Sequence, residues 1–138
     1  MWRQLQAEGA RLFIPIGAAN ILQRFAHFIE VRAFLTTVET LGSGRYLKRW
    51  GRRLHQHGFT REDALVLALA TYGTDSEGNV RGVDVLITLD RLFLNNFRNH
   101  RAKLRTRLSA MTRQLPMPYY HATLPTLLHP EKLVSSKY

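Results

Sequence analysis

The chain has 138 residues, no cysteine, and 20 Lys and Arg against 10 Asp and Glu, a formal net charge of +10. This length fits one domain with its own hydrophobic core, and an apolar fraction of 45% is typical of a globular chain. The lack of cysteine excludes a disulfide framework, a thiolate zinc site and a cysteine nucleophile in this sequence. Charges and prolines interrupt every apolar run before it reaches membrane-spanning length, and no apolar signal segment follows Met1, so we expect a cytoplasmic protein with no membrane partner.

Basic residues are concentrated in two stretches that contain no acid, residues 41–59 and residues 91–130. Most of them are arginine, whose planar guanidinium matches the oxygens of a phosphate. Segregated positive charge of this kind favours RNA binding, although a simple solvated surface is the alternative. The predicted nucleic-acid-binding residues are Arg45, Lys48, Arg49, Arg52, Arg53, Arg98, Arg101 and Arg105.

Apolar spacing predicts the elements of the N-terminal part. Residues 2–10 predict a short helix, and residues 10–15 a buried strand closed by proline. Residues 17–40 carry apolar side chains at helical spacing, which predicts one long helix or two shorter ones. After a Gly-Ser-Gly break, residues 46–54 predict a basic amphipathic helix.

The second half begins with a helix-start signal, because Thr60 is a favourable N-cap and Glu62 and Asp63 follow in the first turn. The apolar run after Asp63 predicts a buried helix. A turn-rich segment then leads to a predicted central strand at 83–88, and residues 92–108 predict a helix with a break at Asn95 and Asn96.

This alternation predicts an α/β fold of three layers, α/β/α, with a mostly parallel central sheet. We expect the α/β domain to span residues 1–115. Residues 116–138 contain several prolines, which favour extended chain, and we expect them to form a tail packed on the domain.

Two aspartates are candidates for catalysis. A helix that leads into a strand runs antiparallel to it, so Asp63 at the helix start and Asp90 at the strand end should converge at one edge of the sheet. Two carboxylates there would suit Mg²⁺ or Mn²⁺, which orient phosphates and activate water. Thr88 lies on the same side of the strand as Asp90 and is a candidate partner of a carboxylate, a metal-bound water or a phosphate. The alternative is that each acid simply caps its helix.

The helix Asp63–Ala70 followed by the strand Val83–Asp90 resembles the C-terminal half of a PIN domain, an α/β family with many Mg²⁺- or Mn²⁺-dependent ribonucleases. The resemblance extends over residues 2–97, and it implies that Asp63 and Asp90 are metal ligands and, with Thr88, catalytic residues. It also implies RNA as substrate and, since many members are toxins of toxin–antitoxin pairs, an antitoxin-like protein partner. The family's Asp-bearing first strand has no counterpart before the first predicted helix, so we expect an N-terminally truncated fold.

Three hypotheses follow. The first is a metal-dependent ribonuclease. The second is a catalytically incomplete PIN-like protein that binds RNA or a protein without cleavage. The third is a homo-oligomeric interaction module that associates through the proline-rich tail and the pair Tyr119 and Tyr120.

Overall fold

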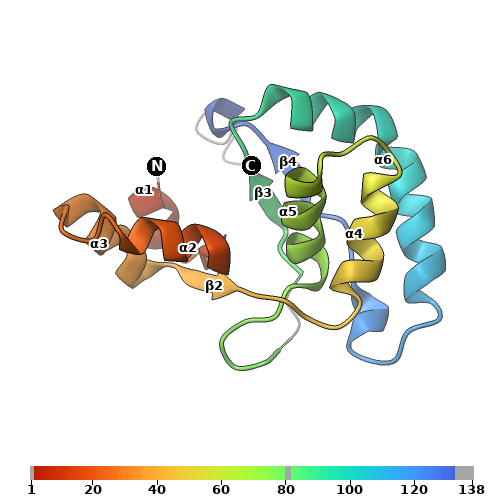
Figure 1. The fold of residues 1–138 in the computed structure, drawn as a ribbon, viewed down its shortest axis with the longest axis horizontal. Coiled ribbons are helices and arrows are strands. Elements are labelled where there is room, and N and C mark those ends of the chain that lie inside the picture. Colours follow the sequence, from red (N-terminus) through yellow and green to blue (C-terminus); the bar gives the residue numbers. More distant parts are fainter. Residues whose placement is uncertain (1, 80–81, 133–138) are drawn as a thin grey trace.

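The computed structural model describes residues 2–79 and 82–132, and its chain forms two lobes (Figure 1). Residues 1 and 80–81 of the expected domain and residues 133–138 of the expected tail lie outside the described part. The N-terminal lobe consists of α1 (Trp2–Ala7), β1 (Phe13–Pro15), α2 (Ile16–Gln23), α3 (Ile29–Thr37) and β2 (Glu39–Leu41). The second lobe consists of α4 (Leu47–His55), α5 (Arg61–Tyr72), β3 (Val85–Ile87), α6 (Arg91–Thr112), a 3₁₀ turn (Tyr119–His121) and β4 (Thr126–Leu128).

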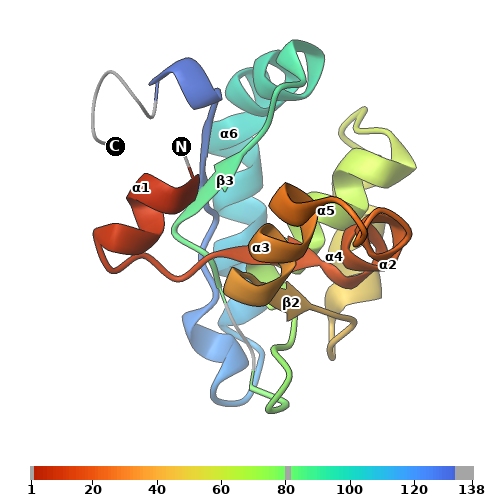
Figure 2. The same cartoon turned by 90° about the vertical axis from the view of Figure 1, so that its left-hand side faces the viewer.

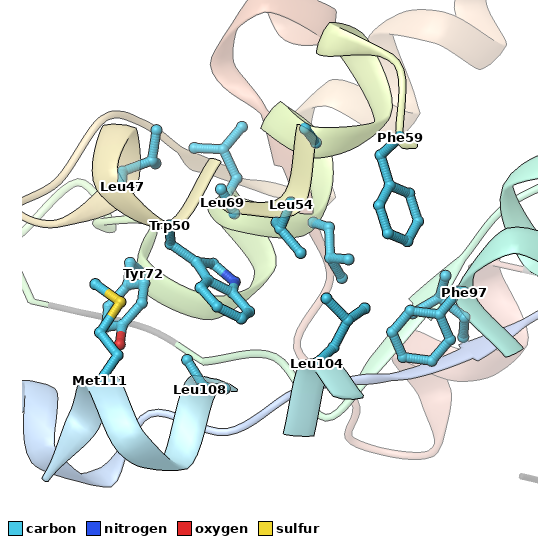
Figure 3. Close-up of a cluster of buried hydrophobic side chains, with 14 of the residues drawn as sticks. Leu47, Trp50, Leu54, Phe59, Leu69, Tyr72, Phe97, Leu104, Leu108 and Met111 are labelled. Atoms are coloured by element: carbon cyan, nitrogen blue, oxygen red, sulfur yellow. The ribbon is translucent and has the colours of Figure 1, made fainter. Parts of the chain in front are cut away.

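Helices α4, α5 and α6 enclose the main hydrophobic core (Figure 3). The amphipathic pattern of α4 places its apolar residues inward, and Trp50 and Leu54 are fully buried. Leu67 of α5 and Leu104 of α6 are fully buried as well. Asn95 and Asn96 do not interrupt α6. Phe93 and Leu94 before them and Phe97 after them are buried on the same helix.

The strands form two separate parallel pairs among the described residues, so the predicted single central sheet requires correction. β1 pairs with β2, and β3 pairs with β4. Each strand has only three residues, and its partner comes from a segment whose sequence gives little strand signal: a predicted helix end for β2 and the proline-rich tail for β4. The fold is therefore mixed α/β with parallel strands, as expected at the coarser level.

The two lobes join through a short antiparallel bridge between Gly42 and Thr74, whose backbone groups exchange hydrogen bonds of 2.9 and 3.0 Å. Gly44 lies directly against this bridge. A Cβ on Gly44 would come within 2.4 Å of Thr74 Oγ1 and 2.6 Å of the Tyr72 carbonyl oxygen, so only glycine permits this approach. Figure 2 shows the N-terminal lobe in front of the second lobe in the view turned by 90°.

Asp75 stabilises the loop that follows α5. We would expect a loop aspartate to be solvated, yet Asp75 is only 7% exposed. Its Oδ1 accepts hydrogen bonds of 3.0 Å from the backbone N–H groups of Glu77 and Asn79, which closes the turn. This acid therefore has a structural role.

No helix within residues 2–79 and 82–132 has the length and apolar content that crossing a membrane requires.

Two buried polar atoms give a test of the core. Trp50 Nε1 and the Tyr72 hydroxyl have no hydrogen-bond partner within the described chain, and burial raises the pKa of Tyr72 to about 12. Replacing Tyr72 by Phe removes an unsatisfied hydroxyl, so we expect unchanged or increased stability in urea unfolding. Leu104→Ala, which opens a cavity in the same core, should cost about 2–5 kcal/mol. A strongly destabilised Tyr72→Phe variant would contradict this packing.

Candidate functional site

Asp63 lies in the first turn of α5. Thr60 is the N-cap, and its Oγ1 accepts a 3.1 Å hydrogen bond from the backbone N–H of Asp63. This places the Asp63 carboxylate near the N-terminal end of the helix, where the helix dipole favours negative charge. The side chain is half-buried.

Asp90 lies between β3 and α6 and is the N-cap of α6. Its Oδ1 accepts a 3.1 Å hydrogen bond from the Phe93 backbone N–H. Its own N–H donates to Thr88 Oγ1 at 3.1 Å. Thr88 therefore holds the backbone of Asp90 in place, and its hydroxyl is already engaged locally. Asp90 itself is exposed.

The two carboxylates, hereafter the acid pair, influence each other electrostatically. The pKa of Asp63 is raised, first by burial and next by the negative charge of Asp90, with a smaller contribution from Glu62. A hydrogen bond from the Thr60 side chain acts in the opposite direction and lowers it. This coupling indicates that the two carboxylates lie close enough to influence each other.

The backbone path explains this convergence. Helix α5 ends at Tyr72, and the chain returns so that the Val83 N–H donates to the Ala70 carbonyl at 2.9 Å. The end of α5 and the start of β3 are thereby held together. Because α5 and β3 run in opposite directions from this point, the start of α5 and the end of β3 lie at the same end of the second lobe.

The chemistry of the acid pair fits a hard divalent cation. Carboxylate oxygens are the ligands that Mg²⁺ and Mn²⁺ prefer, and Mg²⁺ commonly keeps several waters while bound by one or two carboxylates. The charge contributions that act on Asp63 come from carboxylates, so a cation placed there would relieve repulsion. Within the described chain, no group of three or more His, Asp or Glu residues is arranged to hold a metal.

Seven of the eight predicted nucleic-acid-binding residues are exposed, and Arg53 is half-buried. Arg45 stacks over the Tyr46 ring at 5.0 Å. On α4, helical geometry places Lys48 and Arg52 on one face and Arg49 and Arg53 on a face about 100° further around the helix axis. The structure therefore divides the basic residues of α4 between two faces.

A hollow of about 510 Å³ lies between α4 and α5, and its rim is basic. Lys48 and Arg52 line it together with His55 and Arg61, which the sequence analysis did not select. Arg61 lies next to the predicted helix start and His55 one turn from Arg52, so helical spacing was the signal that could have found them. Leu65, Ala64 and Ala68 also line it.

The tail contacts the core through only part of the predicted tyrosine pair. Tyr119 packs edge-on against Tyr46, with ring centroids 4.9 Å apart, and it is half-buried. Tyr120 is 49% exposed. Only one of the two rings is thus available to a second copy of the chain.

No protein-family model, no curated protein and no solved structure matches this chain.

Replacing Asp90 tests the acid pair. Asp90→Asn keeps an oxygen that accepts from the Phe93 N–H, so the cap should survive, while the charge that raises the pKa of Asp63 disappears. We expect an NMR titration of the Asp63 carboxyl to give a lower pKa in this variant. Asp90→Ala should lower the Asp63 pKa in the same direction and also cost about 1 kcal/mol of stability through the lost cap. If the pKa of Asp63 were unchanged in both variants, Asp90 would have no electrostatic influence on Asp63, and the acid pair would be contradicted.

Proposed function

We propose that this chain is a PIN-like domain that acts on RNA as a Mg²⁺- or Mn²⁺-dependent ribonuclease, with Asp63 and Asp90 as the metal ligands. The observation that supports the proposal best is the raised pKa of Asp63, which is caused first by burial and next by the negative charge of Asp90. The sequence resemblance assigns the same two residues to the metal site. The proposal includes a three-layer PIN-like arrangement, which goes beyond the mixed α/β fold described above.

Each residue of the proposed site has a defined task. Thr60 orients the first turn of α5 and holds Asp63. Thr88 fixes the backbone of Asp90 and is a positioning residue. A divalent cation bound between the carboxylates would supply a polarising charge for a phosphodiester and a more acidic bound water.

Protonation of Asp63 competes with metal binding. Because its pKa is raised, Asp63 takes up a proton at a higher pH than an ordinary aspartate. Cation binding requires the carboxylate form, so metal-dependent activity should be present above the Asp63 pKa and lost as the pH falls through it.

The second candidate is RNA binding without cleavage. It is favoured by an excess of basic side chains: the acid pair contributes two carboxylates, whereas seven of the eight predicted nucleic-acid-binding residues are exposed and the eighth is half-buried. Binding of phosphates by these residues releases counterions, so affinity should fall steeply with salt. This candidate needs no metal.

A single-stranded RNA labelled at one end distinguishes the candidates. For the ribonuclease, we expect cleavage that requires Mn²⁺ or Mg²⁺. In Asp63→Asn and Asp90→Asn it should fall by at least the roughly 10–100-fold that the loss of an outer-shell partner of a metal ligand costs. Asp84→Asn is the matched control, because it removes an exposed carboxylate before the opposite end of β3.

The affinity of the protein for the same RNA is measured in parallel at several salt concentrations. Salt-sensitive binding without turnover would favour the second candidate. Cleavage that persists at the wild-type rate in both acid variants would overturn the metal site. Binding that does not respond to salt would count against both candidates.

A further inference from the structure

Two basic stripes run along α6, one on each side of its buried face. Residues three and four positions apart lie on the same flank of a helix, and this spacing defines both stripes. The buried residues Phe97, Leu104 and Leu108 separate them. One stripe contains the predicted Arg98, Arg101 and Arg105, and the other contains His100, Lys103 and Arg107.

The second stripe faces the turn between α4 and α5. The His57 and His100 rings lie edge to face with centroids 5.7 Å apart, and both residues are half-buried. Gly58, at a φ of 86°, allows the tight turn that follows His57. Phe59 then packs against His100, with centroids 6.4 Å apart, and fixes the turn against α6.

Hydrogen bonding determines which nitrogen of His100 is free. His100 Nδ1 lies 2.9 Å from the Asn96 carbonyl oxygen, which can only accept, so Nδ1 carries a proton. Nε2 is then the nitrogen left for other partners. His55, on the same turn as His57, is engaged in the same way, because its Nδ1 donates to the Phe59 carbonyl at 2.8 Å.

The electrostatic surroundings of His57 are positive. Its pKa is lowered, chiefly by burial and then by Arg107, His100 and Lys103, all from α6. Each charged or titratable group that acts on it from the facing helix is a base. An anion entering here would offset this repulsion and favour protonation of His57.

We infer that this seam between the α4–α5 turn and α6 is a binding site for a phosphodiester of RNA, and that binding is coupled to uptake of a proton by His57. The site consists of His57, His100, Lys103 and Arg107. The inference deepens the proposed function by identifying a phosphate contact, and it rests on that proposal for the identity of its ligand. It does not depend on the acid pair.

Sulfate is the probe for the anion site, because it keeps its charge over the range in which histidine titrates. We expect added sodium sulfate to raise the pKa of His57, followed by NMR of the imidazole C–H signals, relative to sodium chloride of equal ionic strength. Lys103→Gln and Arg107→Gln should reduce this upward shift. Arg32→Gln is the matched control, since it removes an exposed charge from α3, in the other lobe.

RNA affinity measured against pH tests the ligand. If one proton is taken up on binding, the Kd for RNA should rise as the pH increases. The rise should be up to about tenfold per pH unit between the pKa of His57 in the free protein and its pKa in the complex. His57→Gln should flatten this part of the profile and weaken binding at the acidic end. The profile should be constant below the lower of the two pKa values.

Three results would overturn the inference. The first is a His57 titration that sulfate does not shift. The second is an equal shift at the exposed His27 and His121, which would indicate general salt effects. The third is an RNA pH profile that His57→Gln leaves unchanged, which would remove RNA as the ligand even where sulfate binds. RNA that fails to bind at all, with an intact sulfate effect on His57, would refute the proposed function and the RNA assignment together, but would leave the anion site itself.

Discussion

Burial of helix α5 is the constraint on which the rest of the second lobe depends. Its sequence is apolar on nearly every side, and Leu67, Ala68 and Tyr72 are all fully buried. Such a helix is stable only when neighbouring elements cover it, which α4, α6 and the strand β3 do. Thr60 determines where the helix begins, and the hydrogen bond from Val83 to Ala70 determines how the chain returns. The position of Asp63 relative to Asp90 follows from these two features.

Capping and metal binding are compatible roles for the acid pair. Asp90 uses one carboxylate oxygen to accept from Phe93, and this leaves its second oxygen for other ligands. Asp63 lies at a helix N-terminus, which favours its charge, yet its pKa is raised. The loss of solvent and, next, the repulsion from Asp90 therefore outweigh the favourable local contacts. An arrangement of this kind accumulates negative charge that a cation can neutralise.

Local sequence signals were sufficient for the helices of the second lobe and for β3, but not for β4. The N-cap Thr60, the amphipathic pattern of α4 and the β-branched run before Thr88 each predicted an element that the structure contains. Chain direction alone predicted that Asp63 and Asp90 converge, and the influence of the Asp90 charge on the pKa of Asp63, second to that of burial, supports this prediction. Long-range pairing was harder to predict, because β2 and β4 have three residues each and become strands through their partners. The basic site at His57 was missed because its members come from two segments, and only the spacing of His100, Lys103 and Arg107 indicated a shared face.

The central claim is that Asp63 and Asp90 form one cation site, and paramagnetic broadening by Mn²⁺ tests it most directly. Mn²⁺ is titrated into the protein, and the backbone amide and carboxyl NMR signals are followed. We predict that broadening begins at Asp63 and Asp90 together, extends to Thr60 and Thr88, and disappears in Asp90→Asn. Broadening that begins at the loop acid Glu77, or that affects Asp63 and Asp90 at clearly different Mn²⁺ concentrations, would contradict the account.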